Sequence, residues 1–573
     1  MSCPRCCLLL VLLLLVARST SAQVLYVKAD ASGAADGSSW ANAFTDLQAA
    51  LGAAQAGTEI WVAAGTYTPG ADRTASFMLQ SDVALYGGFL GDETMQDERD
   101  WTTHETILSG DIGAPGDATD NVYHVVNGSS TLASAVLDGV TISGGAATGT
   151  FPKNRGGGIR MVGGNATIRN VTISGNIARD DGQRAGFGAG IFNDVGSSPT
   201  LVNVRFIDNH AEGSAGGGGM ANKNNSHPTL MDVTFEGNSA GLLGGGMTND
   251  TGSSPTLVNV VFRGNSAEYT GGMDNYQNAD PVLWNVTFEN NTATEYGGGM
   301  TNDENSDPKL YNVIFAGNVA ENATKPGGGG LQNNASNPLL VGVTFAGNRA
   351  ANGADGMFSN AESAPVVRNA IFWGNGIEIV GPVDLSHAIV QGGFEGTAVL
   401  DADPLFVQMP TTEVGGDLHL QATSPALNAG DAAALPEDAQ DLDADEDRSE
   451  PLPVDRGGAA RIHNGAIDLG AYEEVTPVSN EESPGSLGFH LDPPFPNPVE
   501  DSTTLRYRLD RPGYVQLRVF DVRGREVGIL VDASQSLGEH HATFHTTGLS
   551  SGLYFARLRT AAGFATHPFV LLP

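Results

Sequence analysis

Cysteine, lysine and long apolar runs are all scarce in this sequence of 573 residues. The three cysteines lie within the first seven residues, so the rest of the chain cannot form disulfides and must be stable by other means. Only five of the 29 basic side chains are lysines, and the net charge is −36. Such an acidic chain repels phosphates, which argues against a nucleic acid partner and against binding to anionic lipid. After residue 22, no segment is long and apolar enough to span a bilayer, so we expect no transmembrane segment in the mature chain.

The first 22 residues have the pattern of a secretory signal peptide. Arg5 supplies the positive charge, Leu8–Val16 forms a short apolar core, and Thr20-Ser21-Ala22 is a cleavage site of small residues. The cysteines precede the apolar core, so they do not form a lipid-attachment motif. We therefore predict export, and a mature chain that begins at residue 23.

A Phe-x-x-Asn motif recurs through the middle of the chain, separated by loops of variable length. The steps between the phenylalanines are 29, 27, 26, 27, 30 and 27 residues. The motif begins at Phe206, Phe235, Phe262, Phe288, Phe315, Phe345 and Phe372. A Gly-rich stretch ending in Met-x-Asn lies between most copies, as at Met247 and Met300. Fixed motifs joined by variable loops indicate a repeat architecture.

Within one repeat the apolar residues alternate, as in "PTLVNVRF", residues 199–206. Val204 and Phe206 are expected to point inward and Arg205 outward, with Asn203 at a corner. The abundance of Pro, Gly, Asn and β-branched residues disfavours the alternative, an α-helical solenoid. Three short strands and three corners in roughly 27 residues make one coil of a parallel β-helix, with successive coils about 4.8 Å apart. Equivalent residues then form columns, and the asparagines form amide ladders.

These repeats resemble those of polymorphic outer membrane proteins over about residues 135–390. The segment 36–69, with a helical stripe from Ala43 to Ala54, a strand at Ile60-Trp61-Val62 and a turn at Gly65-Thr66-Tyr67, resembles the N-terminal cap of pectate-lyase-like β-helices. Residues 401–473 resemble the choice-of-anchor Q module that ends many secreted β-helices, and we expect this segment to cover the last coil.

A polar linker and a different pattern follow the repeats. Residues 490–573 alternate between strands and turns, which predicts a small antiparallel β-sandwich. Pro496-Asn497-Pro498, the turn at 521–525 and Ser551-Gly552-Leu553-Tyr554 resemble the C-terminal sorting domain of the type IX secretion system. The final residues, Phe569–Pro573, lack the basic residue often found there. This resemblance implies recognition by that secretion machinery, followed by release or attachment at the outer membrane surface.

The predicted fold is therefore all-β: a right-handed parallel β-helix with three strands per coil, followed by a small β-sandwich. The predicted division is a signal peptide at 1–22, an N-terminal cap with the first coils at 23–105, β-helix coils at 106–400, the C-terminal end of the β-helix at 401–474, a linker at 475–488 and the sorting domain at 489–573.

Candidate binding residues come from two patterns. Lysine and arginine gather in the early coils beside Asp180 and Asp181, and this group suits a polyanionic glycan if it shares a surface, although a solvated face is the simpler explanation. Its members are Lys153, Arg155, Arg160, Arg169, Arg179, Arg184 and Arg205. Trp284 and Tyr311 occupy the same repeat position on adjacent coils. They stack on sugars if they are exposed, and they belong to a satellite core if a loop covers them.

An acidic run, "DLDADED" at 441–447, places Asp441, Asp443 and Asp445 at the spacing that begins a calcium loop, although Glu446 stands where glycine is expected. A bound calcium ion and a solvated acidic loop are both open at this point.

No acid occupies the outward position before the repeated phenylalanine, so that column cannot supply the paired carboxylates of a glycoside hydrolase. The sequence favours a non-enzymatic surface protein that adheres to, or binds, a glycan. The alternatives are a polysaccharide lyase that acts on a polyuronate through the region from Lys153 to Arg205, and a passive stalk or matrix component.

Overall fold

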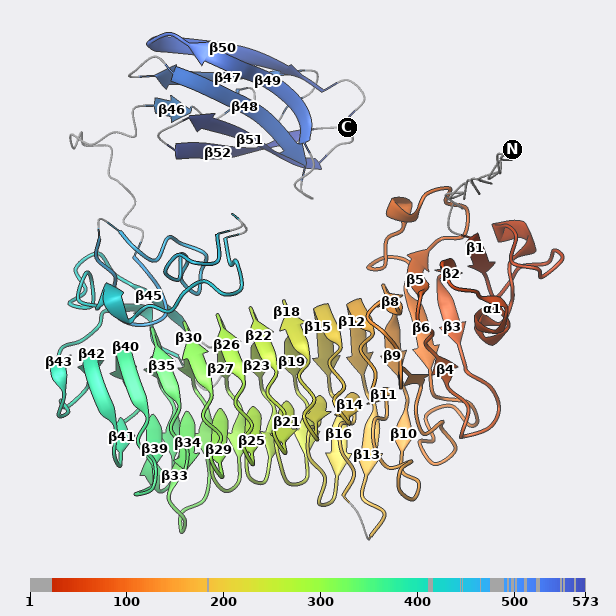
Figure 1. Ribbon diagram of the computed structural model, residues 1–573, viewed down its shortest axis with the longest axis horizontal. Helices are drawn as coiled ribbons and strands as arrows, with labels where there is room; N and C mark the ends of the chain where they lie inside the picture. The colour runs from red at the N-terminus through yellow and green to blue at the C-terminus, as the bar shows by residue number, and fades with distance from the viewer. Residues whose placement is uncertain are drawn as a thin grey trace, which may run out of the picture. The chain divides into compact units, whose positions relative to one another are not determined.

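The computed structural model divides into two compact units, residues 1–475 and 476–573 (Figure 1). It describes residues 23–571, except 183–184, 411–415, 444, 446, 464, 475–488, 492–493, 496–498, 500–501, 510–512, 522–525, 547–548, 550–551 and 561–562. The predicted signal peptide, the linker, Pro496-Asn497-Pro498, Arg184, Glu446, most of the 521–525 turn and Ser551 therefore lie outside the described residues. No helix in the described part of the chain is long and apolar enough to cross a membrane.

The first unit is a parallel β-solenoid built from three sheets. The largest, here called the large sheet, has 22 strands, and most of its coils contribute two strands separated by a corner. Its first row is β1 Gln23–Val27, β2 Thr58–Ala63, β5 Val83–Phe89, β8 Val136–Asp138, β18 Thr229–Met231, β22 Thr256–Val258, β26 Val282–Trp284, β30 Lys309–Tyr311 and β35 Leu339–Val341, and β43 Thr397–Leu400 pairs with both rows. Its second row is β3 Gly65–Tyr67, β6 Thr106–Ser109, β9 Thr141–Ser143, β19 Thr234–Glu236, β23 Val261–Arg263, β27 Thr287–Glu289, β31 Ile314–Ala316 and β36 Thr344–Ala346. Both rows are joined in β12 Thr167–Ser174, β15 Thr200–Ile207, β40 Val366–Trp373 and β42 Asp384–Val390.

Two smaller sheets complete the middle coils. The methionine sheet has 11 strands: β4 Phe77–Met78, β7 Val126–Asn127, β11 Ile159–Val162, β14 Ile191–Asp194, β17 Met220–Asn222, β21 Met247–Asp250, β25 Met273–Tyr276, β29 Met300–Asp303, β34 Leu331–Asn334, β39 Met357–Ser359 and β41 Ile379–Val380. The short-strand sheet has eight: β10 Ala146–Ala147, β13 Ile177–Arg179, β16 His210–Glu212, β20 Ser239–Ala240, β24 Ser266–Ala267, β28 Thr292–Ala293, β32 Val319–Ala320 and β37 Arg349–Ala350. A further pair, β33 Gly327–Gly328 and β38 Gly353–Ala354, lies in the loops.

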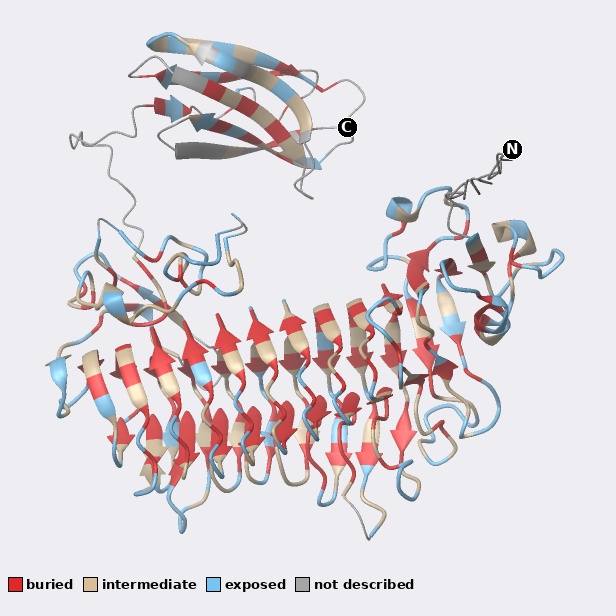
Figure 2. Ribbon diagram, viewed as in Figure 1, coloured by how far each residue is buried: buried red, intermediate tan, exposed pale blue. Residues whose placement is uncertain are grey.

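The repeated phenylalanines stack in one column inside the solenoid, as predicted. From Phe206 to Phe372, neighbouring ring centroids lie 4.5–4.9 Å apart. All seven rings are fully buried, and so are the methionines that face them, such as Met247 and Met273. Figure 2 shows this buried interior along the strands. Arg205 is exposed between buried Val204 and Phe206, which confirms the alternation.

Asparagine ladders run along the solenoid beside this core. Asn265 is representative: its Nδ2 donates to the Oδ1 of Asn291 at 2.9 Å and to the carbonyl of Phe235 at 3.0 Å. A second buried ladder joins Asn222, Asn249 and their equivalents. The third ladder lies at the corner predicted for Asn203, whose φ is 52° in the left-handed region that asparagine tolerates. Asp232 and Gly342, which interrupt this asparagine series, also have positive φ, 55° and 65°.

The N-terminal end contains the predicted helix, α1 Leu47–Ala53, whose first turn is capped by the Asp46 side chain accepting from the Gln48 amide at 2.9 Å. Leu47, Ala50 and Leu51 are buried in the solenoid core. Two short 3₁₀ turns, Trp40–Asn42 and Gln96–Glu98, lie in the neighbouring loops. The turn predicted at Gly65-Thr66-Tyr67 is wrong. These residues form strand β3, because β6 of the next coil pairs with them in parallel.

Residues 401–474 fold back over the outer face of the large sheet. The segment contains β44 Phe406–Gln408 paired with β45 Asp417–Leu420, and a 3₁₀ turn at Ala432–Ala434. Leu418, Leu420 and Leu469 pack on Ile314 and Ile371. The sequence predicted a cover for the last coil, whereas these contacts extend over earlier coils as well. The outward isoleucines of those coils explain the difference, because they need an apolar cover.

The second unit consists of two antiparallel sheets, ordered β46-β47-β50 and β49-β48-β51-β52. Its strands are β46 Phe489–Leu491, β47 Ser502–Leu509, β48 Gly513–Asp521, β49 Glu526–Gln535, β50 Gly538–His545, β51 Gly552–Thr560 and β52 Gly563–Leu571. Leu505, Leu517 and Leu558 are among the buried residues of its own core. The unit is therefore the antiparallel β-structure that the alternating pattern predicted.

Candidate functional site

The outer face of the large sheet is partly open and partly covered. Thr172, Thr234 and Val261 are half-buried on the earlier coils of this face. Ile314 and Ile371, on later coils, lie beneath the folded-back segment. The change from open to covered surface forms a step on the sheet.

A pocket of about 420 Å³ lies at this step. Its floor consists of the outward side chains of three successive coils, and its wall comes from the folded-back segment. It is lined by Val261, Arg263, Thr287, Glu289, Ile314, Ala316, Gly416, Asp417, Leu418, His419, Arg456 and Tyr472. Cationic, anionic and aromatic groups thus converge on a concave site.

The wall of the pocket is held together by polar contacts. The imidazole of His419 stacks on the Tyr472 ring at 4.0 Å between centroids, and its Nδ1 lies 2.6 Å from Asp417 Oδ1. The hydrogen bond with His419 holds the pKa of Asp417 below its ordinary value, and burial raises the pKa of Tyr472. At pH 7 the pocket therefore presents an ionised Asp417 and a neutral phenol.

The floor and wall meet through two arginines. Arg456 donates from Nε to Thr287 Oγ1 at 3.1 Å, and its guanidinium has no ion-pair partner among the described residues. Arg263 pairs with Glu289 at 3.1 Å. Arg456 is consequently the cation in this pocket that is available to a ligand carboxylate or to sugar hydroxyls.

The arginine group predicted from the sequence does not share one surface. Arg169 and Arg205 lie on the outer face of the large sheet, but Arg160 belongs to the methionine sheet and Arg179 to the short-strand sheet. Lys153 lies over the Tyr123 ring instead. Neighbours in sequence separate here because the chain passes from one sheet to the next within each coil. The described members of this group are therefore spread over more than one face of the solenoid.

Arg169 and Arg205 differ in how firmly they are held. Arg169 pairs at 2.6 Å with Asp138, which is buried and also pairs with Arg99 at 2.8 Å. Arg205 and Glu236 are 3.5 Å apart, with Arg205 exposed and Glu236 half-buried, an arrangement that contributes little to stability. Arg205 is thus the more readily available of the two for a ligand. Arg160 is half-buried, and burial lowers its pKa.

Trp284 and Tyr311 are buried, with 3% and 6% exposure. Their rings lie 4.4 Å apart between centroids, beneath Leu435, Leu442 and Leu452 of the folded-back segment. Of the two alternatives, the covered satellite core is therefore the one that holds, and these rings are not exposed for sugar stacking. No periodic signal in residues 435–452 marks them as that cover.

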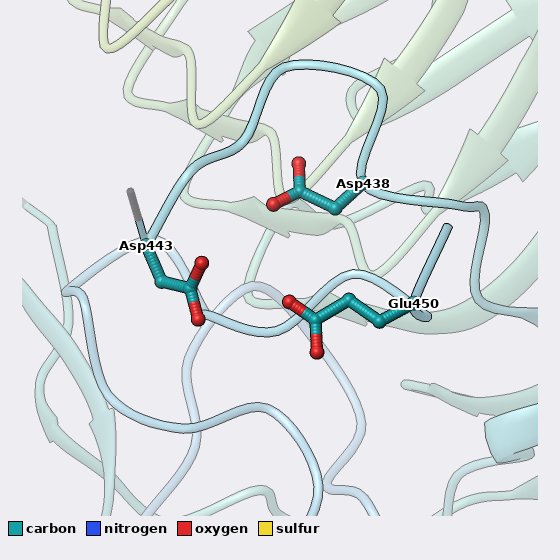
Figure 3. A group of neighbouring side chains, drawn as sticks. All are labelled: Asp438, Asp443 and Glu450. Carbon is teal, nitrogen blue, oxygen red and sulfur yellow. The ribbon is translucent and has the colours of Figure 1, made fainter. Parts of the chain in front are cut away.

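The acidic run lies in the same covering segment. One oxygen each from Asp441, Asp443 and Asp445 lies within 4.8 Å of the others. Asp438 and Glu450 were not predicted, yet they form a second group with Asp443 at the same spacing (Figure 3). They lie outside the acidic run, and the antiparallel return of the chain brings them to it.

A second acidic cluster lies on the outward side of the methionine sheet. Asp274 is buried beside Asp250 and Asp303, and burial raises its pKa to about 7. Thr270 Oγ1 donates to its Oδ1 at 3.1 Å, and Lys223 pairs with Asp250. Because only 4% of Asp274 is exposed, we interpret the cluster as a polar layer under the loops rather than as a substrate site.

Two sequence families match separate parts of the chain. Residues 121–281 match the right-handed β-helix region, and residues 494–571 match the secretion system C-terminal sorting domain. The chain is a right-handed β-helix protein with a type IX sorting domain. That domain indicates secretion and attachment at the cell surface, and it implies an interaction with the secretion machinery.

The other comparisons concern whole chains. No curated protein matches this β-helix protein. Among solved structures, the crystal structure of pectate lyase Pel9A aligns with a TM-score of 0.41 and 16% identity, over 79% of this chain and 97% of that one.

Proposed function

We propose that this β-helix protein is a non-enzymatic surface protein that binds a carbohydrate chain along the open outer face of the large sheet. The carbohydrate lies on this face from Arg205 to the pocket at His419, Arg456 and Tyr472. The observation that carries this proposal is the pocket itself, because it combines an aromatic ring, acceptor groups and a guanidinium that has no ion-pair partner among the described residues, at the end of an open face.

The chemistry of the pocket suits a sugar better than an apolar ligand. Aromatic rings stack on the C–H faces of sugars, while carboxylates and guanidinium groups bond their hydroxyls. Arg456 and Arg205 attract a sugar that carries a carboxylate. The acidic protein as a whole repels anions, so these two local cations can offset the repulsion of only a few negative charges. We therefore expect a neutral or uronate-containing glycan rather than a highly charged one.

An array of neutral and uronate-containing glycans, probed with the mature protein, tests this proposal. We expect binding that Arg456→Gln weakens at least tenfold. Arg349→Gln is the matched control, since Arg349 is exposed on the short-strand sheet, and it should bind like the wild type. Unsaturated products released from uronate polysaccharides would instead show a lyase, and no binding to any glycan would indicate a passive stalk.

A further inference from the structure

The acidic loop of the folded-back segment is closed by backbone pairing at its base. The Asp438 amide donates to the Glu450 carbonyl at 2.8 Å, and the Leu452 amide donates to the Pro436 carbonyl at 2.8 Å. This pairing brings Asp438 and Glu450 side by side at the point where the loop begins and ends. Asp443 of the acidic run lies close to both.

Two carboxylate oxygens at this base are buried and have no hydrogen-bond partner among the described residues. Asp438 is fully buried, and its Oδ2 accepts from the Leu442 amide at 2.6 Å, but its Oδ1 has no hydrogen bond within the described structure. Glu450 Oε1 is likewise buried and unpaired. Burying carboxylate oxygens without donors is costly unless a cation compensates. Figure 3 shows the carboxylates of Asp438, Asp443 and Glu450 directed toward a common space.

We propose that Asp438, Asp443 and Glu450 bind one calcium ion. One oxygen from each lies within 4.8 Å of the other two, and ligands at about 2.3–2.6 Å from a shared ion can be up to about 5 Å apart. A set of carboxylates alone suits a hard cation. Magnesium is less suitable, because it retains most of its water and rarely takes three protein carboxylates. Asp441 and Asp445, which lie close to Asp443, add negative charge at the exposed side of the site.

The proposed ion has a mechanical consequence. Leu435 and Leu452 flank the loop, and Leu442 lies within it, so the geometry of the loop sets how these leucines pack on Trp284 and Tyr311. Without the ion, repulsion among the carboxylates opposes the closed loop. With the ion bound, the leucines stay packed on Trp284 and Tyr311, and the folded-back segment stays attached to the solenoid. This role does not depend on carbohydrate binding.

Calorimetric titration of the chelator-treated mature protein with calcium chloride tests the site. We expect one calcium ion per chain, with affinity reduced at least tenfold in Asp438→Asn and in Glu450→Gln. Asp447→Asn is the matched control, because it removes the same charge from the same loop but belongs to neither group, and it should keep wild-type affinity. Absence of binding by the wild type, or wild-type affinity in both Asp438→Asn and Glu450→Gln, would overturn the proposal.

Hydrogen exchange tests the mechanical role separately. With calcium at a hundredfold excess over its dissociation constant, local opening should be suppressed about a hundredfold. Amides of residues 435–443 and of β26 and β30 should therefore exchange more slowly with calcium than with chelator. This difference should vanish in Glu450→Gln and persist in Asp447→Asn. Equal exchange of the wild type under both conditions would show that the ion does not hold the cover.

Discussion

Replacing Phe262 by alanine should remove one ring from the middle of the phenylalanine column. The ring is fully buried, with its centroid 4.7 Å from that of Phe235 and 4.9 Å from that of Phe288. Neighbouring backbone leaves little room for collapse, because even a β-carbon on Gly246 would lie 2.7 Å from this ring. The lost transfer energy and the remaining cavity should together lower the free energy of unfolding by about 3–5 kcal/mol.

Urea unfolding of the mature protein, followed by circular dichroism, measures this loss. Thr234→Ala is the control, since Thr234 is half-buried on the outer face of the adjacent coil, and its loss should cost less than about 0.5 kcal/mol. Hydrogen exchange of the flanking strands should locate the weakening at the coils around Phe262. Equal destabilisation by the two substitutions would refute the assignment of the inward and outward columns.

Asn265→Ala should cost about 3–5 kcal/mol in urea unfolding, since it removes the bonds that the side-chain amide donates to Phe235 and Asn291 and leaves two N–H donors of buried Asn238 without their acceptor; a loss below about 1 kcal/mol would contradict the ladder's role. Burial raises the pKa of Asp274 from 3.8 to about 7, so the folded state retains a proton that the unfolded state loses, and stability should fall as pH rises from about 4 to 7. Asp274→Asn should therefore raise stability at pH 8 by up to about 4 kcal/mol with little change at pH 4, and an equal change at both pH values would argue against the shift. Deleting residues 489–573 should leave a folded β-helix that is retained in the periplasm, as fractionation and immunoblotting would show, and appearance of the truncated protein at the surface would contradict the sorting role.

The solenoid was predictable because its repeat imposes the same requirement on every coil. Phe206 and its equivalents must fill one interior column, and Asn203 and its equivalents must turn one corner, so spacing alone reveals both. The two-residue alternation then separates inward from outward side chains. The turn expected at Gly65 was an error because this residue precedes the first copy of the repeated motif, so no spacing marks it as part of a strand.

The candidate site was not predictable in the same way. It depends on residues 401–474, which are not periodic, and on their docking against coils that lie more than 100 residues away, as in the bond from Arg456 to Thr287. His419 and Tyr472 therefore carried no signal in the sequence. Asp438 was missed for a related reason, since only its burial and its unpaired oxygen distinguish it from the other acids of the loop.

Isothermal titration of the mature protein with an oligosaccharide that the array identifies tests carbohydrate binding most directly. We expect one oligosaccharide per chain, at least tenfold weaker binding by Arg456→Gln and wild-type binding by Arg349→Gln. Equal affinities for the wild type and both variants would contradict the placement of the glycan in the pocket.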